Sequence, residues 1–303
     1  MVIKKLIILN MAQDTPNEQT FRDDLQDSLQ SDYELVHIDS DNLLVDAQSG
    51  EVNFVVNNEK LDLEDTFVFV RRLRKFSDLP ALFCRFMLHR GVPFTDVENA
   101  SHKVTTDKSY AVPVLAENHL PVPRTLVTHM HGLSANMQYV VDNIVFPCVI
   151  KGEGSKGEWV FKVDDVNELL AKAGEIAAEK ETLLSIQELI PNTYDVRALV
   201  LGREFVAAIR RSASDGAFHN NVSKGGTAVP EQLSNTEIEL CIEAGQVAGI
   251  DFAGVDFVRT DSGIKILEVN KSPQLGGMRS VYPDLSIGSS LKAHIQRVVN
   301  QES

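Results

Sequence analysis

Apolar and polar positions largely alternate in two segments near the end of the chain. Residues 253–259 and 264–270 follow a period of two, which is typical of half-buried β-strands. The residues between them, 261–263, end with Gly263 and predict a three-residue loop whose glycine is left-handed. The pattern therefore predicts an antiparallel hairpin that lies with one face on a core.

A three-residue loop sets the register of the two strands so that Asp256 lies opposite Glu268. The alternation puts Asn270 on the same face as Glu268. Two carboxylates and one amide oxygen are the ligands that a hard cation such as Mg²⁺ prefers. The opposite face would be apolar, supplied by Val255, Phe257, Leu267 and Val269. A solvated edge hairpin with ordinary surface acids has a similar pattern and stays open as the alternative.

Strand and helix patterns alternate over the first hundred residues, as a small open parallel sheet requires. The expected elements are strands at 3–9, 34–38 and 67–70, helices at 20–30 and 79–90, and a polar hairpin-like stretch at 43–63. No Gly-x-Gly-x-x-Gly follows the first strand, where residues 10–14 read Asn-Met-Ala-Gln-Asp. An NAD-type oxidoreductase is therefore disfavoured.

Turn and capping residues divide the rest of the chain. The expected helices lie at 102–118, at 164–176 with Asp164 as cap, from the Ser234–Glu237 capping box to Gly249, and at 288–300. The expected strands lie at 146–151, 159–163, 184–190, 196–201 and 204–209. A glycine-rich turn at 152–157 joins the first two of these strands, unlike a Walker loop, which joins a strand to a helix.

Length and charge limit the classes of function. The chain has 303 residues, enough for a sizeable core and two or three subdomains, and a formal net charge of −14 at pH 7. Nucleic acids and anionic membranes favour basic surfaces, so neither is an expected partner. No apolar run is long enough to span a membrane, and residues 2–9 fit a first buried strand better than a signal peptide, so we expect a cytoplasmic protein.

Cysteines and histidines give little sign of a disulfide or a zinc site. Cys84, Cys148 and Cys241 are odd in number, widely spaced and in apolar surroundings, which favours reduced core thiols. His129 and His131 alternate on a potential strand, but no third ligand at a known zinc spacing accompanies them.

Two further segments could bind a nucleotide. The glycine-rich turn could donate backbone N–H groups to phosphates and act as a lid, with Lys151 reaching phosphate from the preceding strand. The backbone at Gln187–Leu189 could meet an adenine edge, with Glu188 free to accept a hydrogen bond. Taken alone, the first pattern fits a plain exposed hairpin with a solvated lysine better, and the second pattern is weak by itself.

The order of these segments closely resembles the ATP-grasp superfamily, and most closely its RimK-like alpha-L-glutamate ligases. The match covers roughly residues 94–280, and the N-terminal unit agrees only in outline. It rests on Thr106-Asp107-Lys108-Ser109, Pro121-Val122-Pro123, Lys151 with its glycine loop, Gln187-Glu188, Asp195-Val196-Arg197, residues 206–226, Ala253-Gly254-Val255-Asp256 and Glu268-Val269-Asn270. The resemblance implies an α/β (α+β) fold of the ATP-grasp type with an N-terminal half-Rossmann-like pre-ATP-grasp domain. It places this domain at residues 1–100, a central subdomain with the lid at 101–185, and a C-terminal subdomain with the metal site at 186–303.

The resemblance also implies a role for each matching residue. Lys108 and Lys151 would hold ATP phosphates covered by Ser155, Lys156 and Gly157; Gln187, Glu188 and Leu189 would receive the adenine end, with Asp195 near the ribose. Asp256, Glu268 and Asn270 would hold two Mg²⁺, for which Mn²⁺ can substitute. Lys151, Arg211 and Asn221 would be catalytic. Arg210, Arg211, His219, Asn221 and Lys271 would contact the substrates.

Two positions depart from the family pattern. His219 stands where the family usually has an arginine, and Lys271 stands where it usually has a small residue after Glu-x-Asn. Imidazole lacks the bidentate fork of guanidinium, so these departures leave the identity of the substrate open.

The reaction implied is ATP-dependent ligation of a carboxylate to an amine through an acyl phosphate, adding an amino acid such as glutamate to a small-molecule or peptide acceptor. Two other readings stay open: an ATP-grasp kinase that phosphorylates a hydroxyl, and a non-catalytic nucleotide-binding module. The oligomeric state, including a homo-oligomer, is also open.

Overall fold

The computed structural model of the chain describes residues 2–10, 16–39, 42–48, 51–71, 78–100, 108–152, 159–179, 183–212 and 226–301. Its N-terminal unit is a parallel sheet in the order β2-β1-β6. The elements of this unit are β1 (Lys5–Asn10), α1 (Pro16–Leu29), β2 (Glu34–Asp39), β6 (Thr66–Arg71), α2 (Asp78–Arg90) and the short 3₁₀ helix Val97–Ala100. The predicted strand and helix alternation is thus confirmed.

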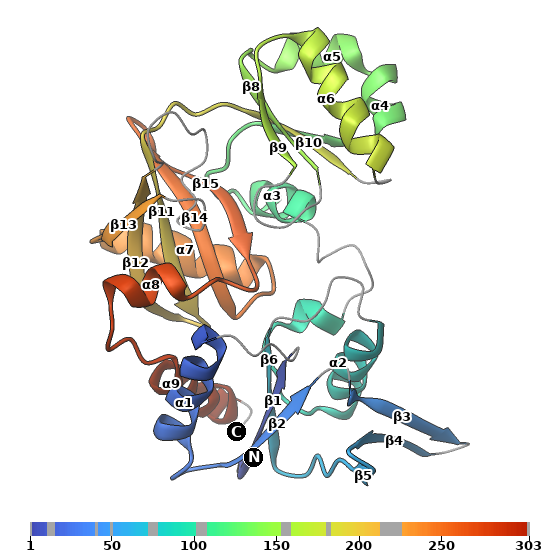
Figure 1. The fold of residues 1–303 in the computed structure, drawn as a ribbon, viewed down its shortest axis with the longest axis vertical. Coiled ribbons are helices and arrows are strands. Elements are labelled where there is room, and N and C mark those ends of the chain that lie inside the picture. Colours follow the sequence, from blue (N-terminus) through green and yellow to red (C-terminus); the bar gives the residue numbers. More distant parts are fainter. Residues whose placement is uncertain are drawn as a thin grey trace.

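The polar stretch after β2 forms a small antiparallel sheet beside α2 (Figure 1). It contains β3 (Leu44–Gln48), β4 (Glu51–Val56) and β5 (Glu59–Lys60) in the order β3-β4-β5. Phe54 of β4 packs edge-on against Phe83 of α2, with ring centroids 4.7 Å apart. This contact joins the hairpin to the core on one side of the parallel sheet.

An antiparallel sheet in the order β7-β10-β8-β9 follows, with helices on one face (Figure 1). Its elements are β7 (Thr125–Thr128), α4 (Met130–Ala135), α5 (Met137–Asn143), β8 (Cys148–Lys151), β9 (Val160–Val163), α6 (Val166–Glu179) and β10 (Leu184–Glu188). Leu169, Ala173 and Ile176 of α6 are buried against the sheet, as their spacing predicts.

Two local predictions in this region were wrong. Asp165, not Asp164, caps α6, because its Oδ1 accepts from the N–H groups of Asn167 (2.8 Å) and Glu168 (2.9 Å). The segment with His129 is not a strand, since β7 ends at Thr128 and α4 begins at Met130.

The largest sheet is antiparallel, in the order β13-β12-β11-β14-β15. Its strands are β11 (Tyr194–Leu201), β12 (Glu204–Ser212), β13 (Thr227–Pro230), β14 (Phe252–Thr260) and β15 (Gly263–Asn270). One face packs on α3 (Lys108–Glu117) and α7 (Asn235–Val247). The predicted capping box of α7 is present, with Ser234 and Glu237 each bonding the other's backbone N–H.

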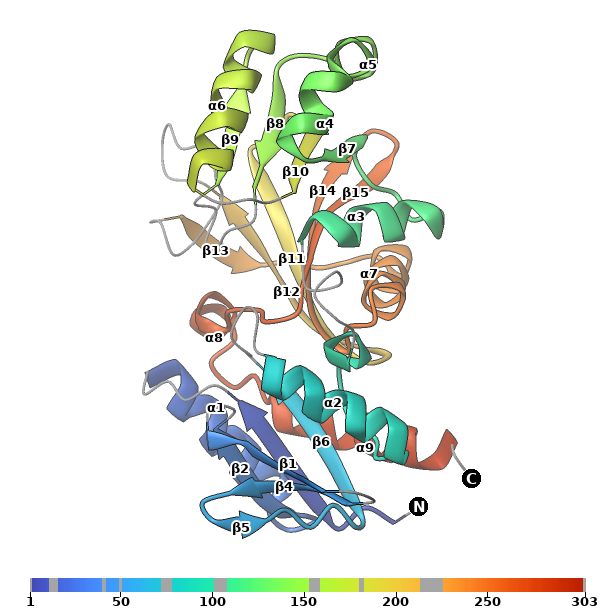
Figure 2. The same ribbon diagram turned by 90° about the vertical axis from the view of Figure 1, so that its right-hand side faces the viewer.

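The end of the chain returns to the N-terminal unit. After α8 (Gly276–Val281), helix α9 (Ile287–Gln301) lies beside α1, as both views show (Figures 1 and 2). Leu291 and Ile295 of α9 share one core with Phe21 of α1, Phe69 of β6 and Leu199 of β11. The N-terminal sheet and the largest sheet are therefore joined by a continuous apolar core.

Three further findings bear on the expectations from sequence. Cys84, Cys148 and Cys241 are buried free thiols, as predicted, and burial raises their pKa values to about 12, 11 and 12. In the described segments, no helix has both the length and the apolar character that crossing a membrane needs. Strand β10 continues past residue 185, where a subdomain boundary was expected.

Candidate active site

The hairpin of β14 and β15 brings Asp256 opposite Glu268, as the sequence predicts, but by a different route. The strands pair from Thr260 and Gly263, so the connecting loop has two residues, 261 and 262, and Gly263 has φ +112°. A bulge beyond Phe257 then restores the predicted register. A shorter loop and a bulge therefore compensate each other.

The bulge also changes which side chains face the core. Ile264 and Ile266 lie in the core with Val269, Val255 and Phe257. Leu267, which was expected there, is only partly buried. Asp256, Glu268 and Asn270 lie on the other face of the sheet.

Asp256 lies between two arginines on neighbouring strands. Arg197 of β11 donates to it from Nε (2.7 Å) and Nη2 (2.6 Å), and Arg211 of β12 places Nη2 3.0 Å from Oδ2. Burial alone would raise the pKa of Asp256, but the two guanidinium groups outweigh burial and lower this pKa to about 2. Asp256 is therefore a carboxylate at neutral pH.

Asp195 holds Arg211 from the other side. Its Oδ1 accepts from Arg211 Nε at 2.6 Å, across the pair of strands β11 and β12. Burial raises the pKa of Asp195 to about 6, although Arg211 opposes this shift. The geometry gives Asp195 a direct structural task, fixing the guanidinium between two carboxylates.

Asn270 and Glu268 complete the polar cluster. Asn270 Nδ2 lies 3.4 Å from Asp256 Oδ2, and Glu268 faces Asp256 across the hairpin, with its Oε1 shielded from solvent. Two opposed carboxylates would repel each other if no positive charge lay nearby. Here Arg197 and Arg211 already neutralise Asp256.

The donor set fits magnesium. Two carboxylates and a side-chain amide oxygen at one end of a sheet offer the hard oxygen ligands that Mg²⁺ takes. Within the described ranges, no group of three or more His, Cys, Asp or Glu side chains could hold a metal ion.

Lys151 and Gln187 lie together on the four-stranded sheet. Lys151 Nζ donates to Gln187 Oε1 at 2.7 Å, and Gln187 is 3% exposed. Next to them, Glu188 Oε1 accepts from the backbone N–H of Arg124 at 3.0 Å. This carboxylate oxygen is therefore already bonded to the chain, whereas a free carboxylate was expected from the sequence. Leu189 directly follows β10.

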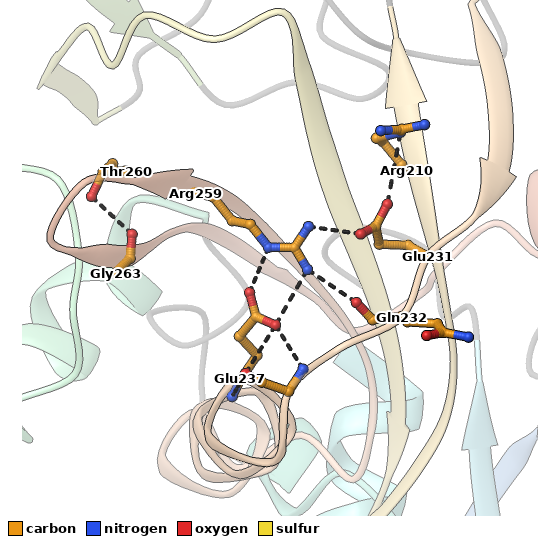
Figure 3. Close-up of polar contacts among 8 residues, drawn as sticks. Arg210, Glu231, Gln232, Glu237, Arg259, Thr260 and Gly263 are labelled. Carbon is orange, nitrogen blue, oxygen red and sulfur yellow. Dashed lines mark hydrogen bonds and ion pairs between the residues drawn. The ribbon is translucent and has the colours of Figure 1, made fainter.

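Arg210 points away from the cluster around Asp256. Its Nε lies 3.7 Å from Glu231, and Glu231 also binds Arg259 at 2.7 Å (Figure 3). Arg259 binds Glu237, which tethers the β14–β15 hairpin to the first turn of α7. Neighbouring residues on a strand face opposite sides, so Arg210 and Arg211 cannot both face the same substrate site from β12.

Several predicted residues are outside the described part of the chain: Ser155, Lys156, Gly157, His219 and Asn221. Lys108 begins α3, and Lys271 directly follows β15. Sequence reasoning gave no role to Arg197, although its position two residues after Asp195 places both side chains on one face of β11.

Comparisons with known proteins show to which family the chain belongs. The family model of the RimK-like ATP-grasp domain matches residues 105–292. A probable alpha-L-glutamate ligase of Legionella pneumophila (strain Corby) is 29% identical over 207 residues, 67% of this chain and 67% of that protein. A protein of the same description from Klebsiella pneumoniae (strain 342) is 32% identical over 199 residues, 65% of each chain.

Solved structures share the fold. The ATP-grasp ligase PsnB, complexed with a minimal precursor, superimposes with a TM-score of 0.69 at 18% identity, covering 98% of this chain and 100% of that one. A RimK domain ATP-grasp protein from Sphaerobacter thermophilus DSM 20745 gives 0.63 at 16% identity, covering 93% and 96%. The fold is therefore of the ATP-grasp type, and the chain belongs to the RimK-like ATP-grasp family of ATP-dependent carboxylate–amine ligases.

Proposed function

We propose that this ligase adds an amino acid such as glutamate to a small-molecule or peptide acceptor, using the polar cluster around Asp256 together with Lys151. The observation that carries the proposal is the convergence of Asp256, Glu268 and Asn270 beside Arg197 and Arg211. The matching curated relatives are named probable alpha-L-glutamate ligases, which supports glutamate as the amino acid.

In this proposal the carboxylate substrate attacks the γ-phosphorus of ATP and gives an acyl phosphate and ADP. The amine then attacks the acyl carbon, phosphate leaves, and the amine loses a proton as the amide forms. A carboxylate is already ionised at neutral pH, so the first step needs no strong base, and positioning supplies most of the rate.

The residues of the cluster would have distinct tasks. Asp256, Glu268 and Asn270 would hold two Mg²⁺, with Mn²⁺ able to substitute; bound metal supplies neutralisation of phosphate charge. Arg211, fixed by Asp195, would present its guanidinium to the transferring phosphoryl group. We propose this positioning task for Asp195 in place of a ribose contact.

The nucleotide would be held largely by the four-stranded sheet. Lys108 and Lys151 would bind phosphates under a lid formed by residues 155–157, and Gln187–Leu189 would lie at the adenine end. Asn221 and His219 would lie at the substrates with Lys271. Arg210 is left out of the site because it pairs with Glu231.

The proposed acceptor is either a peptide or a small molecule. Another structure of PsnB is described as a complex with a precursor peptide, and VanG is described as a D-Ala:D-Ser ligase, so both peptide and small substrates occur among proteins of this fold. Free amino acids and ATP would meet such an enzyme in the cytoplasm. No nucleic-acid partner is proposed, because the chain carries a net charge of −14.

One experiment tests the proposal. Purified protein is incubated with Mg·ATP and a matrix of amino acids and carboxylate acceptors, and ADP release is read together with product mass. A new amide with stoichiometric ADP supports the proposal, and selective use of glutamate supports the narrower form. A phosphorylated acceptor without a new amide would indicate a kinase. ATP binding without ADP formation across the whole matrix would indicate a non-catalytic module.

A further inference from the structure

A row of three polar side chains crosses the four-stranded sheet. Lys151 Nζ donates to Gln187 Oε1 (2.7 Å), Gln187 Nε2 donates to Thr125 Oγ1 (2.9 Å), and Thr125 Oγ1 donates to the carbonyl of Pro123 (3.0 Å). The register explains the row: Thr125 is directly opposite Gln187, and Lys151 is opposite Ser185, diagonal to Gln187. Ile150 and Ile186 point to the core on the other face.

The donors and acceptors of this row fix the direction of the amide. The ammonium of Lys151 has only donors, so it must meet the oxygen of Gln187. The hydroxyl hydrogen of Thr125 is used on Pro123, so toward Gln187 this oxygen can only accept. A flipped amide would break both bonds, and a side chain 3% exposed has little water to replace them.

The row is anchored to a segment that also touches the metal-site hairpin. The carbonyl of Pro121 accepts from Ile266 N at 2.8 Å, and that of Val122 accepts from Lys265 Nζ at 3.1 Å. Both donors are on β15, the strand that carries Glu268. The segment that holds Thr125 thus has fixed contacts on both sheets.

We propose that Gln187 is a positioning residue for Lys151. Its amide holds the ammonium in place without neutralising it, whereas a glutamate there would form an ion pair and compete with phosphate for the same charge. This inference rests on the proposed phosphate-binding task of Lys151. It also gives the Gln187 side chain a task separate from a backbone contact with adenine.

The test compares equilibrium binding of ATP and of adenosine, which has no phosphate. Loss of a hydrogen bond to a charged group corresponds to a change of about tenfold or more in an equilibrium constant. Gln187→Met is therefore expected to weaken ATP binding about tenfold and to leave adenosine binding unchanged. Gln187→Glu should weaken ATP binding as well, because the new carboxylate would compete with phosphate for the ammonium. Steady-state ADP release should show the same change as a higher KM for ATP.

Thr125 supplies a second test with a matched control. Thr125→Val removes the acceptor that orients the amide and should weaken ATP binding in the same direction, while Thr125→Ser keeps the hydroxyl and should behave as wild type. Circular dichroism checks that each variant is folded. If Thr125→Val and Gln187→Met both bind ATP as wild type does, the positioning role is wrong.

Two further outcomes separate the possible failures. Equal weakening of ATP and adenosine by Gln187→Met would overturn the positioning role, since the side chain would then act on the nucleoside. Lys151→Met is the reference: unchanged ATP binding there would overturn the phosphate task of Lys151, and the positioning role with it. If Lys151→Met weakens ATP binding and Gln187→Met does not, the phosphate task of Lys151 stands and the positioning role of Gln187 is wrong.

Discussion

On one face of the five-stranded sheet, the same strands carry aliphatic side chains at one end and charged side chains at the other. Leu199 and Ile209 lie in the core shared with α1 and α9. Two residues along each strand, Arg197 and Arg211 bind Asp256. The period of two continues across the change, so backbone geometry is common to both ends and only residue chemistry separates them.

The two ends stabilise the protein in different ways. Burial of aliphatic side chains contributes about 25 cal/mol per Å² of apolar surface, without requiring a specific partner. Buried charges are tolerated only while each has its partner, and a buried ion pair adds little stability compared with apolar residues. A charged end that adds little stability is consistent with its proposed role in binding and chemistry, and the apolar end holds it in place.

Removing one partner from the charged end should give the largest effect. Asp256→Leu leaves the buried Arg211 and the partly buried Arg197 without their shared carboxylate, so we expect a loss of about 3–5 kcal/mol in unfolding free energy, together with loss of turnover. Urea denaturation and ADP release measure the two effects. A stability equal to wild type would mean that these charges are better solvated than their burial indicates.

Glu268→Gln should separate function from stability. The substitution keeps the shape of the side chain and removes one charged metal ligand, so turnover is expected to fall by about 100-fold or more while the melting temperature stays close to wild type. ADP release at saturating Mg²⁺ and thermal melting are the measurements. Turnover near the wild-type value would remove Glu268 from the metal site.

Leu199→Ala tests the apolar end. Leu199 is fully buried, and truncation should lower the unfolding free energy by about 3 kcal/mol through lost burial and a residual cavity. Turnover per folded molecule should change little, since the charged side chains keep their partners. A selective loss of turnover without a loss of stability would contradict the division between the two ends.

Gly254, between the two ends of β14, should tolerate no side chain. A Cβ there would lie 2.9 Å from Pro273 Cβ, in the segment that follows β15, so Gly254→Ala is expected to cost about 1–3 kcal/mol and to disturb Asn270. Gly174→Ala in α6 is the matched control, because its Cβ would meet nothing within 4 Å and alanine favours a helix. Urea denaturation of both variants distinguishes crowding from a general effect of the substitution.

His294, on α9 beside the apolar end, should give the smallest effect. Burial lowers its pKa below 6.5; Asp251 and Glu204 oppose this shift, and Arg297 reinforces it. A lowered folded-state pKa means that its contribution to stability is complete above about pH 6.5 and is lost as pH falls toward the folded value. Unfolding free energies at pH 7.5 and 5.5 should therefore differ more for wild type than for His294→Gln, and an equal difference would contradict a buried neutral imidazole.

Local patterns predicted much of this architecture. Alternation put Asp256 opposite Glu268, although the chain reaches this register through a shorter loop and a bulge, and the Ser234 capping box marked the start of α7. The bulge next to Phe257 was missed because it depends on how β15 packs, which no local propensity encodes. Short elements with weak periodicity, such as β7, β13, α4, α5 and α8, were missed for the same reason.

The acidic residues of the candidate site were predicted better than its basic residues. Opposed acids stand out in an apolar strand, whereas Arg197 looks like an ordinary polar position until the sheet order puts β11 beside β14. The row of Lys151, Gln187 and Thr125 joins three strands, so only the tertiary structure could reveal it. Residues distant in sequence meet through sheet order, which single-strand patterns do not contain.

Metal binding tests the central claim most directly. Manganese can be titrated into the protein with ATP present and followed by electron paramagnetic resonance, for wild type, Glu268→Gln and Leu199→Ala under conditions where all three are folded. We expect tight Mn²⁺ binding by wild type and Leu199→Ala and clearly weaker binding by Glu268→Gln, because only the last variant loses a ligand. Equal Mn²⁺ affinity and stoichiometry in all three proteins would contradict the assignment of the charged end of the sheet as the metal site.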